Sequence, residues 1–211
     1  MTFICEKFWE SEFAEHQTVQ KATHAALLEP FEELLLAASA TIKAGGKVLF
    51  FGNGGSAGDA QHLATELTVR YKTDRAPIAA IALTTDTSSL TAIGNDFGFE
   101  HLFERQVAAL GKKGDLAIGI STSGKSKNVI NALIEAKKMG IVTAGFTGKT
   151  GGPMAEYCDI LLNVPSTTTA RIQEMHITLG QMLCGALEMN LGLVAEATEQ
   201  NTDDEPAVKS A

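Results

Sequence analysis

The sequence predicts an α/β fold, in which a five-stranded parallel sheet is flanked by helices and preceded by an N-terminal helical extension. Three observations support this. Helical spacing of apolar residues over 8–44 gives way, after Gly45 and Gly46, to short apolar runs separated by helical segments. These runs are almost continuously apolar, as expected for parallel strands covered on both faces. A chain of 211 residues with 45% hydrophobic content can also bury a full core.

The helical extension is expected to contain two helices. The pattern breaks near Glu29 and Pro30, and proline suits the first turn of a new helix. Further helices supply right-handed crossovers between parallel strands, and a long helix closes the fold. They are expected at 57–71, 100–109, 126–138 and 170–193. The strands are expected at 47–51, 78–83, 115–120, 141–146 and 160–164.

Composition limits the classes of function. A net charge of −8 makes a broad nucleic-acid surface unlikely, since phosphate backbones require clustered cations. Three widely spaced cysteines suggest neither a disulfide framework nor a thiolate zinc cluster. No apolar stretch reaches the length of a signal peptide core or a membrane span, so we expect a cytoplasmic protein. We expect residues 1–45 to form the N-terminal helices, 46–194 the α/β domain, and 195–211 a disordered acidic tail.

The loop after the first strand has the composition of an anion site. Residues 52–58 read GNGGSAG and lead into a helix, so glycines let the backbone approach a ligand that the helix amides face. Asn53, Gly54, Gly55 and Ser56 are the candidate binding residues. The alternative is a tight strand-to-helix turn without a ligand.

A second loop follows the strand at 115–120 and carries the hydroxyl groups of Ser121, Thr122, Ser123 and Ser126. Hydroxyl donors beside a helix amino end can bind a phosphate monoester without much positive charge. Polar loops at the carboxyl ends of neighbouring strands would enclose one small phosphorylated ligand, at the switch point of an open sheet.

The same loop offers a competing interpretation, because residues 119–126 match the nucleotide-binding pattern GxxxxGKS. An NTPase also needs an acidic residue after an apolar strand to hold Mg²⁺. The strand at 160–164 ends in Asn163 and Val164, and Asp86 is the only loose candidate. We therefore interpret the match as coincidental and rank an NTPase third.

Four segments in order resemble the bacterial phosphoheptose isomerases, which belong to the sugar-isomerase (SIS) domain family. They are GNGGSAGDAQHLATEL, LTTDTSSLTAIGNDFGFEHLF, ISTSGKSKNVINAL and RIQEMH, within residues 40–190. The resemblance implies the SIS fold, which is flavodoxin- or Rossmann-like, and a homotetramer with active sites between subunits. It also implies conversion of sedoheptulose 7-phosphate to D-glycero-D-manno-heptose 7-phosphate through an enediol, for lipopolysaccharide or surface polysaccharide.

The resemblance extends to individual site residues. It implies substrate contacts from both loops and from Asn95 and Asp96, which the local pattern alone would assign to a turn. Glu66 and Gln173 complete the expected substrate-binding set. Zinc in the family is held by residues corresponding to His62, Glu66, Gln173 and a histidine where this chain has Gln181.

Gln181 is the main departure from the family pattern. His62 and Glu66 lie four apart on one helix face and could ligate one ion, although such a spacing is common by chance. Enediol chemistry needs a titratable base and acid. Glu66 can be the base, but Gln181 cannot carry a proton as the family histidine would. His176 lies about 140° from position 181 around an ideal helix, so we expect a packed or intersubunit histidine there and not a catalytic one.

A non-catalytic SIS protein is the second hypothesis. The initiator-associating protein of bacterial chromosome replication keeps the fold without the catalytic residues. Glu66 and the segment IGNDFG follow the isomerase pattern instead, so an isomerase remains the first hypothesis.

Overall fold

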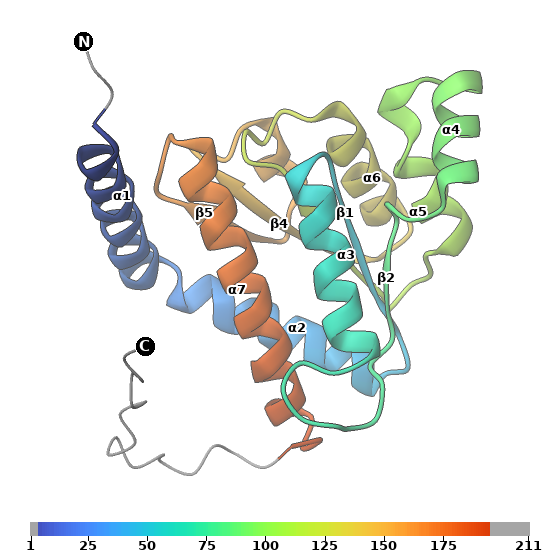
Figure 1. Ribbon diagram of the computed structural model, residues 1–211. Coiled ribbons are helices and arrows are strands. Elements are labelled where there is room, and N and C mark those ends of the chain that lie inside the picture. The colour runs from blue at the N-terminus through green and yellow to red at the C-terminus, as the bar shows by residue number, and fades with distance from the viewer. Residues whose placement is uncertain (1–3, 195–211) are drawn as a thin grey trace.

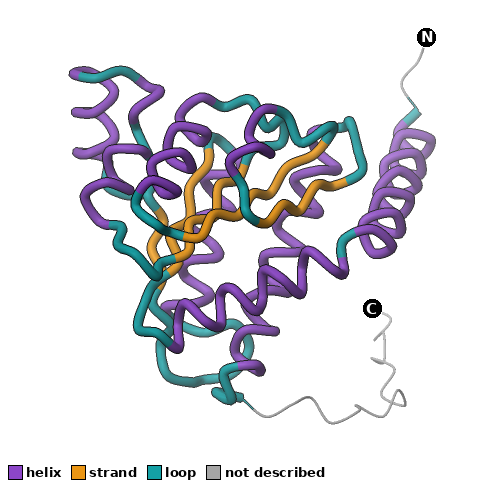
Figure 2. The backbone as a smooth tube through the Cα atoms, turned by 180° about the vertical axis from the view of Figure 1, so that it is seen from behind, coloured by secondary structure: helices purple, strands orange, loops and turns teal. Residues whose placement is uncertain are grey.

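The computed structural model describes residues 4–194 and contains the expected five-stranded parallel sheet. Figure 2 shows the sheet enclosed between helices. The strand order is β2-β1-β3-β4-β5, so the direction of winding reverses at β1 and β3. The strands are β1 (Val48–Gly52), β2 (Ala80–Ala82), β3 (Leu116–Ile120), β4 (Val142–Gly148) and β5 (Ile160–Val164).

Helices cover both faces of the sheet and form two hydrophobic cores. One core includes α2 (Leu28–Lys43), α3 (Gly55–Thr68) and α7 (Thr169–Asn190). The other includes α4 (Thr87–Asp96), α5 (Glu104–Leu110) and α6 (Lys127–Lys138). Alternate residues of β1 enter opposite cores, Val48 and Phe50 one, Leu49 and Phe51 the other. Burial on both faces explains why the strands read as continuous apolar runs.

Helix α1 (Cys5–Ala26) projects from the body of the molecule, as Figure 1 shows. Its inner side is tied to α7 by Arg171, whose guanidinium donates to the Glu12 carbonyl at 2.6 Å. Its outer part exposes the aromatic side chains of Phe8, Trp9 and Phe13. This helix therefore carries more apolar surface than the described chain covers.

The structure differs from the sequence-based expectation in four places. The N-terminal helices part at Leu27 instead of Glu29, and Pro30 lies in the first turn of α2. The segment expected at 100–109 divides into a 3₁₀ turn (Phe99–His101) and α5, and a second 3₁₀ turn (Pro153–Tyr157) precedes β5. Residues 84–98, for which no helix was named, contain α4. The predicted tail at 195–211 lies outside the described residues.

The missed helix α4 is held by its cap more than by an apolar face. The Asp86 carboxylate accepts from the Ser89 amide at 3.1 Å and from its hydroxyl at 2.6 Å. Only Ile93 of this helix is buried. None of the helices within residues 4–194 is long and apolar enough to cross a lipid bilayer.

Candidate functional site

The two glycine- and hydroxyl-bearing loops meet at the switch point of the sheet. They leave the carboxyl ends of β1 and β3, which pair directly in the sheet. Asn53 and Asn128 exchange reciprocal side-chain hydrogen bonds of 2.9 and 2.8 Å, which join the first loop to the start of α6. Sequence reasoning missed Asn128, although its place just after the second loop was a signal. A hollow of about 220 Å³ is lined by Asn53, Phe99, Glu100, Ser126, Lys127 and Asn128.

Two glycines shape the first loop. Gly54, the N-cap of α3, has a φ of 56°, which side chains rarely adopt. A side chain at Gly55 would collide with the Gln173 amide. The structure thus brings Gln173 from α7 against the first loop, 118 residues away in the sequence.

The second loop gathers hydroxyl groups at the amino end of α6. The Ser121 and Ser126 hydroxyls lie 3.1 Å apart, and the Ser123 hydroxyl accepts from the Lys125 amide at 3.2 Å. Ser126 is the N-cap of α6. Gly124, with a φ of 62°, packs against the backbone of the 151–152 segment. Hydroxyls and free amides at a helix amino end are the donors that a phosphate monoester requires.

Three further predicted residues come together between α3 and α7. His62 Nε2 lies 3.1 Å from Glu66 Oε1 and 3.1 Å from the Gln181 side-chain nitrogen. The close approach depends on Gly180, where a Cβ would lie 2.5 Å from Leu63 Cδ1. Glu66 is mostly buried, with 17% of its side chain exposed, so its carboxylate is partly screened from water.

The donor set does not match a catalytic zinc site of the usual kind. Such sites use three ligands drawn from His, Cys, Asp and Glu, with a fourth position for water. Within residues 4–194 no group of three such side chains could hold a metal ion. His62 and Glu66 are two suitable ligands, and the amides of Gln173 and Gln181 are weak ones. We therefore assign no step of the chemistry to a metal.

Asn95 and Asp96 form a hydrogen bond with each other. They are exposed at the end of α4, where the Asn95 amide donates to the Asp96 carboxylate at 2.7 Å. Within the described chain no hydrogen bond joins them to the loops. Their role in binding substrate stays a prediction.

Asp59 is a polar residue of this region that sequence reasoning missed. It lies on α3 between the first loop and His62, and its Oδ2 is buried without a hydrogen-bond partner among the described residues. Burial raises its pKa to about 6, and nearby His62 partly offsets the rise. Its spacing of three residues from His62 was the available signal.

His176 is a packed core histidine, as expected from its position on the helix. It is fully buried, its Nε2–H donates to the Thr147 carbonyl at 2.9 Å, and its ring lies beside Phe146. It faces β4, whereas Gln181 faces α3. Burial lowers the pKa of His176 to about 4.

The buried state of His176 predicts a pH dependence of stability. Above pH 6.5, neither the folded nor the unfolded state binds the proton at this position. Between about pH 6.5 and 4 only the unfolded state binds it, so the free energy of unfolding falls as pH falls, by up to about 3 kcal/mol. Asp59 titrates over part of this window with the opposite sign, so the contribution must be isolated by substitution.

We expect His176→Gln, which keeps a donor for Thr147, to lose less stability than the wild type between pH 7 and pH 5. Denaturant unfolding of both proteins at the two pH values measures the difference. An identical pH dependence in both proteins would contradict the assignment.

Similarity to known proteins agrees with the sugar-phosphate site that the geometry indicates. The SIS domain model matches residues 13–148. The phosphoheptose isomerase of Paramagnetospirillum magneticum is 56% identical over 181 residues, covering 86% of this chain and 94% of the relative. That of Aliarcobacter butzleri is 55% identical over 180 residues, covering 85% and 95%. The chain belongs to the phosphoheptose isomerase family.

Solved structures of that family have the same fold. The phosphoheptose isomerase of Neisseria gonorrhoeae superposes with a TM-score of 0.83 at 43% identity, covering 88% of this chain and all of the other. That of Francisella tularensis gives a TM-score of 0.86 at 35% identity, covering 89% and all of the other. The resemblance to the phosphoheptose isomerases and the predicted α/β fold class are both confirmed.

Proposed function

We propose that this protein is an aldose-ketose isomerase that converts sedoheptulose 7-phosphate to D-glycero-D-manno-heptose 7-phosphate. The observation that carries the proposal is the meeting of two phosphate-type loops near a mostly buried Glu66, in a chain 56% identical to a phosphoheptose isomerase. The product would enter heptose synthesis for lipopolysaccharide or surface polysaccharide.

The geometry supports separate groups for binding the phosphate and for transferring the proton. The hydroxyls of the second loop and the amino end of α6 would hold the phosphate group. The Glu66 carboxylate would remove a proton from carbon 1, the hydroxyl-bearing carbon next to the ketone, and return it to carbon 2, the former carbonyl carbon, through the enediol. In the same reaction the hydroxyl proton on carbon 1 passes to the oxygen on carbon 2, which leaves an aldehyde at carbon 1. His62 lies within 3.1 Å of Glu66 and would orient it, while the Gln181 amide can hydrogen-bond but cannot carry a proton.

Zinc, which the family resemblance led us to expect, is proposed here only as a weakly held ion. His62 and Glu66 would be its ligands, with Gln173 and Gln181 contributing amide oxygens. Loss of the family histidine removes one strong ligand from the set.

Self-association is a further part of the proposal. The exposed aromatic residues of α1 and an apolar cavity of about 170 Å³ between α1, α2 and α7 are surfaces that a second copy could cover. We propose a homotetramer, and light scattering at micromolar concentration tests it. A monomer mass would contradict it. A cytoplasmic location stays a prediction.

The competing functions predict different ligands. The GxxxxGKS match loses support because Gly119 is a strand residue paired between Phe51 and Gly145, and Asp86 caps α4. Binding to the native state raises the melting temperature. We expect sedoheptulose 7-phosphate at 100 Kd to stabilise by about 2.7 kcal/mol, and ATP with Mg²⁺ to have no effect. A larger shift with ATP would restore the nucleotide hypothesis.

A non-catalytic SIS protein remains the second candidate, and Gln181 is the observation that favours it. Such a protein would bind the sugar phosphate, and its own melting temperature would rise on binding, but it would form no aldose. Turnover, measured alongside the thermal shift, separates the two functions.

A further inference from the structure

A deeply buried ion pair joins the end of α3 to α7. Arg75 Nε donates to Glu188 Oε1 at 2.7 Å, and their side chains are 1% and 3% exposed. Arg75 lies seven residues beyond the end of α3, and Glu188 lies in the last turns of α7. Neither residue belongs to the predicted site.

Arg75 also caps the carboxyl end of α3, the helix that carries His62 and Glu66. Its Nη2 donates to the carbonyl of Glu66 itself at 2.7 Å, and its Nη1 donates to the carbonyls of Leu67 at 2.8 Å and Val69 at 3.3 Å. The last carbonyls of a helix have no partner within the helix, and a cation is favoured there by the helix dipole. The guanidinium thus fixes the backbone at the proposed base.

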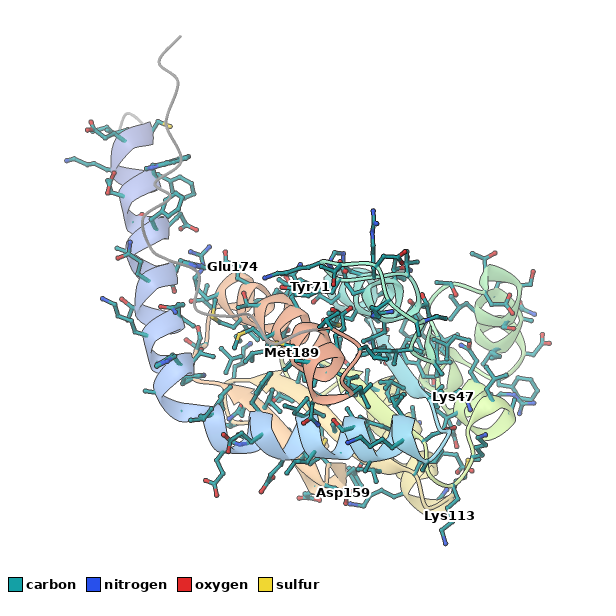
Figure 3. The ribbon with its side chains drawn as sticks, turned by 90° about the horizontal axis from the view of Figure 1, so that it is seen from below. Lys47, Tyr71, Lys113, Asp159, Glu174 and Met189 are labelled. Atoms are coloured by element: carbon teal, nitrogen blue, oxygen red, sulfur yellow. The ribbon has the colours of Figure 1, made fainter. Side chains whose placement is uncertain are left out.

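Glu188 binds the same segment a second time. Its Oε1 accepts from the Tyr71 amide at 3.1 Å, and Gly185 leaves room for the Tyr71 ring, since a Cβ there would lie 2.9 Å from Cε1. Figure 3 shows Tyr71 beside α7. The end of α3 is therefore attached to α7 through both its backbone and the Arg75 side chain.

The placement of the pair indicates a role beyond stability. Burying two charges is costly, and apolar residues of similar volume often stabilise a fold as well or better. An apolar pair could not replace the several hydrogen bonds that one planar guanidinium donates to the end of α3 and to Glu188. Helix α3 carries His62 and Glu66, and α7 carries Gln173 and Gln181, so their relative position determines the geometry of the site.

We propose that Arg75 and Glu188 are positioning residues that hold the Glu66 segment of α3 in register with α7. The effect on turnover rests on the proposed isomerase function. A misplacement of about 1 Å at a reacting group can lower the rate by about 100-fold, so a small shift of α3 would be visible in kcat.

The test uses Arg75→Met, Glu188→Met and the double variant in the full chain. Each single variant leaves one buried charge unpaired and should lower the melting temperature most, whereas the double variant should recover much of the loss. We expect kcat of the double variant to stay at least about tenfold below wild type, with KM within roughly threefold, because the phosphate loops are untouched.

The matched control is Lys47→Met. Lys47 Nζ lies 2.6 Å from the buried Asp115, and this pair joins the starts of β1 and β3, away from the carboxyl edge that holds the loops. Its loss should lower the melting temperature without lowering kcat. The proposal is overturned if the double Met variant keeps the kcat of the wild type. It is also overturned if the double variant and Lys47→Met have equal melting temperatures and equal losses of kcat.

A second measurement does not depend on turnover. Hydrogen exchange at amides 66–71 should accelerate in the double variant relative to the rest of α3 and α7, measured at a temperature where both proteins are folded. Unchanged exchange there would overturn the anchoring. If the wild type itself shows no turnover, the proposed function fails, and the exchange result still decides whether the pair holds α3.

Discussion

Glu66→Gln is expected to lower turnover by about 10²- to 10⁴-fold while leaving the binding of sugar phosphate nearly unchanged. The amide has the shape of the carboxylate but cannot accept a proton from carbon. Glu66 is mostly buried on α3 beside His62, whereas the hydroxyl groups proposed to hold the phosphate lie at the amino end of α6, so binding and chemistry should separate. Steady-state kinetics and calorimetric titration with the ketose phosphate measure the two effects.

Glu135→Gln on α6 is the matched control, because it removes a partly buried carboxylate that pairs with Lys138 and belongs to neither loop. Its kcat should equal that of the wild type. Activity that survives in Glu66→Gln would show that another group transfers the proton, and Asp59 would then be the next candidate.

Gln181→His is expected to raise both zinc affinity and turnover. The present side chain lies 3.1 Å from His62 Nε2, so an imidazole in its place would join His62 and Glu66 as a third strong ligand. It would also add a group that titrates near neutrality. We expect zinc affinity to rise at least about tenfold, equivalent to about 1.4 kcal/mol. Metal content after dialysis, determined beside kcat, measures the change.

Met189→His is the appropriate control, because it adds an imidazole to an exposed position of α7 outside the cavity that a second copy could cover. It should leave both zinc content and turnover at the wild-type level. Zinc already bound stoichiometrically and tightly by the wild type would contradict our account of the donor set, and so would an unchanged affinity in Gln181→His.

The sequence predicted those features that rest on local patterns. The strands were recognisable because residues such as Phe50 and Phe51 are buried on opposite faces, and the first loop because Gly54 needs its φ of 56°. Helix α4 was missed because its Thr- and Ser-rich sequence buries only Ile93 and depends on the Asp86 cap. Two hydrogen bonds between Asp86 and Ser89 mark its start, and the sequence shows no regular apolar spacing.

The rest of the site depends on tertiary contacts that no local pattern records. Asn128 meets Asn53 across 75 positions, and Arg75 meets Glu188 across 113. The contact between Gln181 and His62 depends on Gly180, which appears in the sequence as an unfavourable residue within a helix. The resemblance to a family supplied Asn53, His62 and Gln181 as site residues, whereas Asn128, Arg75 and Glu188 became apparent only in the fold.

The most direct test of the central claim is to incubate the wild-type protein with sedoheptulose 7-phosphate in D₂O and follow the sugar by NMR. We expect an aldose 7-phosphate to accumulate to equilibrium, with deuterium at carbon 2 where the enediol exchanges its proton with solvent. A protein that is folded and stabilised by the ketose phosphate but forms no aldose would contradict the account and favour the non-catalytic SIS function.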